Sequence, residues 1–229
     1  MRPVTRGTVS PSCSNPVVSA RTHLWLTGFP HSGVAELAAW LSEHPDVVPV
    51  RRIVEFPQMQ GALPVDGIWE DVEAEMRAAS APAPDGRVLL EWSEDLLLKV
   101  PALVQVFPGS TALVCQRDGR AVALAVAANE PADWWLSRPT ERVTKKMGQM
   151  LTPVGRALLS WHDENQRVAW DAAVPARFEE LRDGGLAAGE ALLRTLGLPP
   201  CQLPALKLPP DPHPGPLGYD ELGLARLLS

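Results

Sequence analysis

The sequence predicts an α/β domain of three layers, in which a central parallel β-sheet is covered by helices on both faces. Short apolar runs alternate along the chain with longer segments whose apolar residues recur at helical spacing. This alternation is typical of β–α–β units, whose strands lie parallel and buried. The chain has 229 residues, of which 45% are hydrophobic and 21% are charged. We therefore expect one domain with a full hydrophobic core.

Each expected element has its own pattern of residues. Residues 23–27 form an apolar run of the kind found in strands that are buried on both faces. In the helix that follows, at 34–43, the apolar residues repeat at helical spacing until Pro45 stops it. Further strands are expected within 47–56 and at 87–92, 111–116 and 174–178. Further helices are expected at 68–79, 95–107, 120–129, most of 141–170 and 186–196. Pro101 is expected to break the second of these helices, and Pro153 to kink or break the fourth.

The two ends of the chain differ in composition from its middle. Residues 1–21 are rich in Ser, Thr and Pro, which indicates a flexible N-terminal arm. Residues 200–229 are rich in Pro, and we expect them to form an extended strap across the surface with a short helix from Tyr219. The α/β domain itself is then expected to cover residues 22–199.

Composition argues against several classes of function. A net charge of −6 and a pI near 5.4 argue against a nucleic-acid partner, because phosphate contacts need a concentrated basic surface. No apolar run has the length of a signal-peptide core or a membrane span. Cys13, Cys115 and Cys201 lie far apart, so they offer no metal-binding pair and fit a reducing compartment. We expect a cytoplasmic protein with no nucleic-acid or membrane partner.

A Gly/Pro/Ser turn at residues 28–33 joins the first strand to the first helix. Backbone N–H groups at the start of a helix bind anions, so this layout predicts a phosphate cradle. The spacing of Gly28 and Gly33 begins like the loop of nucleotide triphosphatases. Val34 and Ala35, however, stand where that loop needs Lys and Ser/Thr to hold the phosphates and Mg²⁺. Hydrolysis of ATP or GTP is therefore not expected.

A second segment, residues 107–125, has the same strand–turn–helix layout around Arg117-Asp118-Gly119-Arg120. The two segments together resemble the sulfotransferases that use 3′-phosphoadenosine 5′-phosphosulfate (PAPS). The first motif of that family is Gly-x-Pro-(Lys/Arg)-Ser-Gly-Thr-Thr, and its second is a strand, an Arg-Asp-Pro-Arg turn and a helix. Weaker similarity at His44-Pro45, 178–181 and 192–199 extends the resemblance over residues 22–199. It implies a bacterial enzyme with the P-loop-like sulfotransferase fold.

The resemblance implies transfer of a sulfuryl group from PAPS to a hydroxyl or amine of a small molecule, without a metal. It places the cofactor against the cradle residues Pro30, His31, Ser32, Gly33, Val34 and Ala35. His31 stands where the family has the Lys or Arg that contacts the bridging oxygen of PAPS. It either donates a hydrogen bond to the leaving phosphate or merely fills the turn. Val34 and Ala35 replace the two Thr residues that hold the 5′-phosphosulfate in the family.

Two further cofactor positions follow from the second motif. Arg117 matches the arginine that contacts the 3′-phosphate of PAPS, and a planar guanidinium at a strand end suits that contact. The alternative is a surface arginine paired with Asp118. Ala125 stands where the family has a serine as the second ligand of the 3′-phosphate. Several side-chain contacts to PAPS are therefore changed, while the backbone frame is kept.

Two carboxylates are candidates for the base that deprotonates the acceptor. Glu55 lies in a segment similar to a "Lys-Glu-Pro" sequence of many bacterial members, and Glu91 lies near the end of an expected strand. Either carboxylate can instead serve as a cap or an ion-pair partner. The pair Trp134-Trp135 offers an aromatic surface for an acceptor or a hydrophobic anchor for a lid.

Two other classes of function stay open at this stage. The lost side-chain contacts at Val34, Ala35 and Ala125 are compatible with a transferase or lyase that uses another donor on the same fold. The same losses, with His31, are compatible with a non-catalytic member that binds a ligand or a partner protein. The acceptor is not identified by the sequence, and a homodimer is left open.

Overall fold

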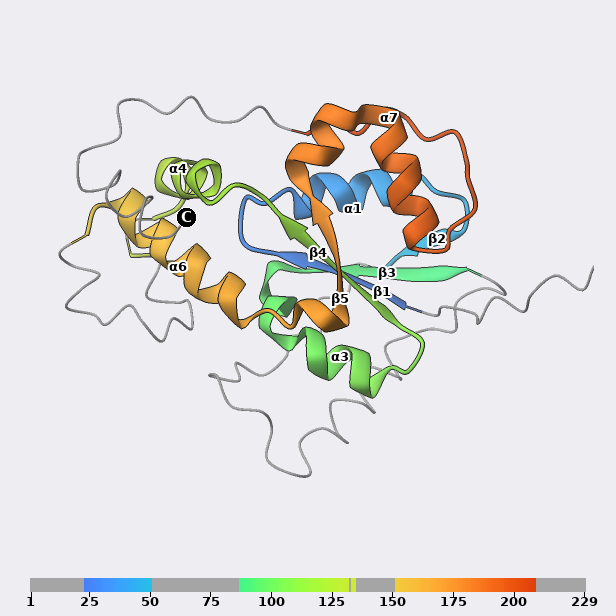
Figure 1. Cartoon of the computed structure of the whole chain (residues 1–229), viewed down its shortest axis with the longest axis horizontal. Helices are drawn as coiled ribbons and strands as arrows, with labels where there is room; N and C mark the ends of the chain where they lie inside the picture. The colour runs from blue at the N-terminus through green and yellow to red at the C-terminus, as the bar shows by residue number, and fades with distance from the viewer. Residues whose placement is uncertain (1–22, 51–86, 132, 135–150, 209–229) are drawn as a thin grey trace, which may run out of the picture.

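Five parallel strands form the centre of the fold (Figure 1). The computed structural model describes residues 23–50, 87–131, 133–134 and 151–208. The strands are β1 (His23–Gly28), β2 (Val47–Pro49), β3 (Val88–Trp92), β4 (Thr111–Gln116) and β5 (Ala173–Arg177), in the spatial order β2-β3-β1-β4-β5. All four neighbouring pairs run parallel. The predicted parallel sheet is confirmed, with β1 at its centre.

Helices cover both faces of this sheet, as the alternating pattern predicts. They are α1 (Val34–Ser42), the 3₁₀ helix η1 (Glu94–Lys99), α3 (Val100–Val106), α4 (Gly119–Asn129), α6 (Pro153–Arg167), the 3₁₀ helix η3 (Trp170–Ala172) and α7 (Phe178–Thr195). One hydrophobic cluster joins the sheet to α1 and α7, and a second joins it to η1, α3, α4 and α6. Figure 1 shows α1 and α7 together on one side of the sheet and α3 on the other. The three-layer α/β class is therefore confirmed.

Three helix boundaries differ from the expected ones or refine them. α7 begins at Phe178, not at residue 186, because Gly185 (φ 53°, ψ −132°) joins two helical segments across a kink. The break in the segment 95–107 falls before Pro101, which lies in the first turn of α3, where its missing N–H costs nothing. Pro153 begins α6, and the Thr152 hydroxyl caps it by accepting from the Gly155 N–H at 3.1 Å.

Residues 199–208 run over α1 without helix or strand. The Trp40 Nε1–H donates to the Pro204 carbonyl at 2.9 Å, and Leu203 is 9% exposed against the first cluster. His44, which is 1% exposed, donates from Nε2 to the Pro199 carbonyl at 2.9 Å while Nδ1 accepts from the Asp46 N–H. The His-Pro turn thus ties the end of α1 to Pro199, directly before the expected strap.

Several expectations concern residues outside the described ranges. They are the arm 1–21, the helix at 68–79, Glu55, Trp135, residues 141–150 and the tail beyond 208. The division of the chain into arm, domain and strap stays a prediction. Within the described ranges, none of the helices combines the length and apolarity that a membrane crossing requires.

Candidate functional site

The loop between β1 and α1 is the candidate anion site. His31 (φ 63°) and Gly33 (φ 97°) both have left-handed backbone conformations, and Ser32 N–H closes a turn on the Phe29 carbonyl at 3.0 Å. The first helical bond runs from Leu37 N–H to the Gly33 carbonyl. The N–H groups of residues 34–36 therefore precede the hydrogen-bond ladder of α1 and lie at the positive end of its dipole. This is the geometry of a backbone anion cradle.

Both glycines of the cradle are required by close packing. A Cβ on Gly28 would lie 2.8 Å from the carbonyl oxygen of Cys115 on the neighbouring strand β4 and would also meet the Ser32 hydroxyl. A Cβ on Gly33 would lie 2.7 Å from the ring of Phe178, the first residue of α7. The loop is thus held between β4 and α7, and only glycine fits at these two positions.

The side chains of the cradle residues point in different directions. Pro30 is buried, and Val34 is 4% exposed inside the first hydrophobic cluster, so only its backbone N–H belongs to the cradle. Ala35 is exposed. Ser32 is 1% exposed, and its hydroxyl has no hydrogen-bond partner among the described residues. A buried hydroxyl without a partner is costly, and an anion in the loop is one group that would satisfy it.

Arg117 brings the second motif into contact with the first. It follows β4, which pairs directly with β1, and its Nη1–H donates to the His31 carbonyl at 2.9 Å. Its guanidinium lies 4.2 Å from the centre of the Phe178 ring, and the residue is only 3% exposed. Asp118 pairs with Arg120 and caps α4, which lowers the pKa of the Asp118 carboxyl. Arg117 is therefore buried under the cradle and supports its backbone.

The ring of His31 contacts a residue that the sequence did not single out. Its Nε2 lies 2.9 Å from Oε1 of Glu130, which directly follows α4. The two side chains are 28% and 29% exposed, so the pair lies at the rim of the site. Ninety-nine positions separate the two residues, and an acidic residue after a helix has no special signal of its own.

Glu91 lies on β3, further back along the sheet than the cradle. It is 7% exposed, and burial raises the pKa of its carboxyl to about 7. In the sheet its neighbour on β1 is Trp25, three residues before Gly28, which is roughly 10 Å along the strand. No ion pair or hydrogen bond of Glu91 is present within the described part of the chain. Its assignment as a base stays a prediction, and Glu55 lies outside the described residues.

The remaining predicted positions lie on α4 and just beyond it. Ala125 is half-buried on α4, and its carbonyl accepts from the Asn129 side chain at 2.7 Å. Trp134 packs edge-on against Phe29 of the cradle loop, with ring centres 5.7 Å apart. This contact agrees with the interpretation of Trp134 as a hydrophobic anchor.

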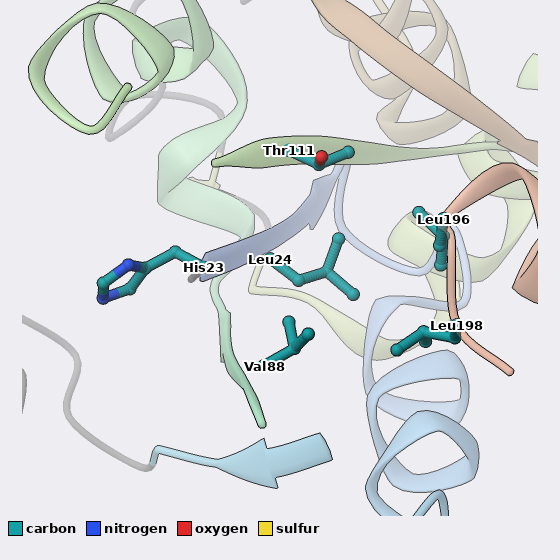
Figure 2. Close-up of a pocket in the computed structure, with 6 residues that line it drawn as sticks. All are labelled: His23, Leu24, Val88, Thr111, Leu196 and Leu198. Atoms are coloured by element: carbon teal, nitrogen blue, oxygen red, sulfur yellow. The ribbon is translucent and has the colours of Figure 1, made fainter. Parts of the chain in front are cut away.

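A cavity of about 110 Å³ opens beside the His31–Glu130 pair. Its wall consists of Val126, Ala127, Glu130, Pro131, Trp134, Pro153, Arg156 and Ala157, from α4, the turn after it and the start of α6. Figure 2 shows another cavity, of about 10 Å³, at the amino ends of β1, β3 and β4. That second cavity is about the size of one water molecule. It lies at the amino ends of the strands, whereas the cradle lies at the carboxyl end of β1.

The described residues contain no group of three or more His, Cys, Asp or Glu side chains placed to hold a metal ion. No protein-family model and no curated protein matches the sequence.

Solved structures give a clear match of fold. A sulfotransferase from Alicyclobacillus acidocaldarius aligns with a TM-score of 0.54 and 17% identity over 84% of this chain and 87% of that one. The sulfotransferase domain from the curacin biosynthetic pathway aligns at 0.53 and 13% identity over 90% and 96%. The sulfotransferase domain from the olefin synthase of Synechococcus PCC 7002 aligns at 0.50 and 15% identity over 90% and 93%. The chain has the sulfotransferase fold.

Proposed function

We propose that this protein transfers a sulfuryl group from PAPS to a hydroxyl or amine of a small molecule. One observation carries the proposal: the two motifs of the resemblance, far apart in sequence, meet where Arg117 donates to the His31 carbonyl. The meeting point lies at the carboxyl ends of β1 and β4, where ligands bind in parallel α/β sheets. The sulfotransferase fold found for the chain agrees with the proposal.

The cradle fits the phosphosulfate end of PAPS through its backbone. The N–H groups of Val34 and Ala35 and the buried hydroxyl of Ser32 are the donors for that end, and they replace the lost Thr hydroxyls only in part. When bound, PAPS supplies a sulfuryl group on a phosphate leaving group. The protein must then orient the acceptor in line with the breaking bond and stabilise charge on the phosphate.

The cavity of about 110 Å³ is the proposed acceptor site. The His31–Glu130 pair joins its wall to the cradle, and Trp134 joins its wall to the cradle a second time through Phe29. Its wall is mostly apolar, with Glu130 and Arg156 as the charged groups. This lining favours a small ring-containing acceptor that presents its hydroxyl or amine to the rim of the cradle.

Calorimetric titration with 3′-phosphoadenosine 5′-phosphate, the product left by PAPS, tests the donor. Saturable one-to-one binding is expected, together with transfer from PAPS to at least one member of a panel of phenols, alcohols and amines. Absence of binding would overturn the proposal and would favour another donor or a non-catalytic role on the same fold.

Filling the cavity tests the acceptor site. The Ala127→Phe substitution places a ring in the cavity and is expected to raise the KM for the acceptor about tenfold or more, while the affinity for 3′-phosphoadenosine 5′-phosphate is kept. Ala128→Phe is the matched control, because Ala128 is the exposed neighbour on α4 and does not line the cavity. Equal acceptor KM values in the two variants would place the acceptor elsewhere.

A further inference from the structure

The contact between His31 and Glu130 determines which ring nitrogen of His31 carries a proton. The carboxylate Oε1 is an acceptor only, so at 2.9 Å the Nε2 atom is the donor. In the neutral ring the second nitrogen, Nδ1, then has a free lone pair and no proton. An imidazole held in this tautomer by a carboxylate is the arrangement of a general base.

The backbone of His31 is held as firmly as its ring. Its left-handed conformation (φ 63°) is uncommon for a residue with a side chain, and the Arg117 guanidinium bonds its carbonyl at 2.9 Å. Arg117 precedes α4 and Glu130 follows it, so one helix and its flanking residues hold His31 at both ends. A residue whose backbone and side chain are both fixed by hydrogen bonds is suited to be a reacting group.

The position of the pair favours proton transfer from an acceptor. Glu130 forms part of the wall of the 110 Å³ cavity and contacts the ring of His31, a cradle residue, so the pair links the cavity to the cradle. Glu91 is less well placed, since it lies roughly 10 Å along the sheet from Gly28, and Glu55 is outside the described residues. Among the described residues, Arg117 and Glu130 are charged residues that contact His31. Glu36 lies in the first turn of α1, and Arg156 of α6 lines the same cavity as Glu130.

We propose that His31 is the general base of this enzyme and that Glu130 is its positioning residue. The inference rests on the proposed sulfuryl transfer. Nδ1 takes the proton of the acceptor hydroxyl as the acceptor oxygen bonds to sulfur, while the bond from sulfur to the bridging oxygen breaks and its electron pair stays on the departing phosphate. The imidazolium that results is balanced by the Glu130 carboxylate.

A lysine at position 31 separates this role from that of a charged donor. His31→Lys would keep or raise the rate if the residue only stabilised charge on the leaving phosphate. A protonated lysine is not a base, so we expect His31→Lys and His31→Ala to lose about 100-fold or more in kcat. Both variants should still bind 3′-phosphoadenosine 5′-phosphate. An active His31→Lys enzyme would overturn the proposal.

Glu130→Gln tests the positioning residue, because the amide keeps the shape but no longer dictates the tautomer. We expect kcat to fall at least tenfold with little change in acceptor KM, and no further loss when it is combined with His31→Ala. Asp133→Asn, an exposed acid three residues on, removes the same charge and should leave kcat unchanged.

Glu91→Gln tests the other described candidate for the base. This variant should keep the pH dependence of kcat. If the pH dependence of kcat disappeared in Glu91→Gln, Glu91 would be the base.

Nitrogen-15 NMR of the histidine rings gives a readout that needs no activity. In the free protein, neutral His31 should carry its proton on Nε2, and Glu130→Gln should allow both tautomers. A proton on Nδ1 in the wild type, or an unchanged ring in Glu130→Gln, would overturn the assignment. The proposed function fails if the wild type transfers no sulfuryl group and binds no 3′-phosphoadenosine 5′-phosphate. The assignment of His31 as the base then fails as well, even if NMR finds the proton on Nε2.

Discussion

At the scale of single residues, the environments differ sharply in and around the candidate site. Glu91 is buried beside Trp25, whereas His31 and Glu130 meet at a partly exposed rim. Cys115, in the core behind Gly28, is fully enclosed, and burial raises the pKa of its thiol well above the usual range. Its burial, its raised pKa and its close approach to Gly28 indicate a packing role rather than a chemical one.

The buried Glu91 carboxyl makes stability depend on pH. Its pKa is raised by burial from 4.5 to about 7, so between these values the native state holds a proton that the unfolded chain has lost. The free energy of unfolding should therefore fall as pH rises from 4.5 to 7, by up to about 3 kcal/mol. Urea unfolding of the wild type and Glu91→Gln at pH 5 and pH 8 measures this. Glu91→Gln should be the more stable protein at pH 8, and parallel pH profiles would contradict the prediction.

Arg117 is expected to matter for binding through the loop that it supports. Removing its bond to the His31 carbonyl should weaken binding of 3′-phosphoadenosine 5′-phosphate by about 1.5–3 kcal/mol in Arg117→Ala. Arg117→Lys should recover only part of this, because it lacks the planar fork. Calorimetry compares both with Arg194→Ala, an exposed arginine at the end of α7, which should bind as the wild type does. Wild-type affinity in Arg117→Ala would remove Arg117 from the binding site.

At the scale of elements, the junction of β1 and α1 decides what the cradle can hold. Left-handed backbone at two positions turns the chain sharply from β1 into α1, so the first N–H groups of α1 lie beside the loop. Phe178 closes the space under this turn and also stacks on the Arg117 guanidinium. The start of α7 is therefore part of the support of the cradle, although no sequence motif marks it strongly.

Gly33 and Gly109 form a matched pair for testing this support. Both have positive φ (97° and 87°), so alanine should cost roughly 1–2 kcal/mol of conformational strain at either site. At Gly33 the added Cβ also collides with Phe178, whereas a Cβ on Gly109 would meet no atom of the described residues within 4 Å beyond its chain neighbours. We expect Gly33→Ala to lose clearly more stability in urea unfolding and to lose anion affinity. Equal losses in both variants would contradict the packing described here.

At the scale of the whole molecule, one face of the fold is completed by the chain after α7. Residues 199–208 lie over α1, with Leu203 buried and two backbone carbonyls bonded to Trp40 and His44. Leu203 and the partly buried Cys201, Leu206 and Leu208 add to the core on the side of α1 and α7. The cradle is thus packed between β4, which approaches Gly28, and α7 with Leu208 of this segment, which approach Gly33.

Leucines of contrasting exposure test that contribution. Leu203 is 9% exposed, and Leu203→Ala should cost about 2–5 kcal/mol, as truncation of a buried leucine does. Leu186 on α7 is 55% exposed, so Leu186→Ala should change stability by less than about 0.5 kcal/mol. Urea unfolding of both variants measures the difference. A Leu203→Ala protein as stable as the wild type would show that residues 199–208 add little to the fold.

The sequence by itself determined the parallel sheet, because the runs at 23–27 and 111–116 have continuous apolar centres, at 24–26 and 112–115, and each leads through a turn into a helix. It also located the cradle and Arg117, since Gly spacing and strand-end position are local signals. Only the tertiary structure decided what depends on contacts between distant segments. It joined His31 to Glu130 across 99 positions, placed Phe178 under Gly33 and buried Glu91 deeply enough to raise its pKa. Such pairings and burial arise from packing, which no local pattern of residues encodes.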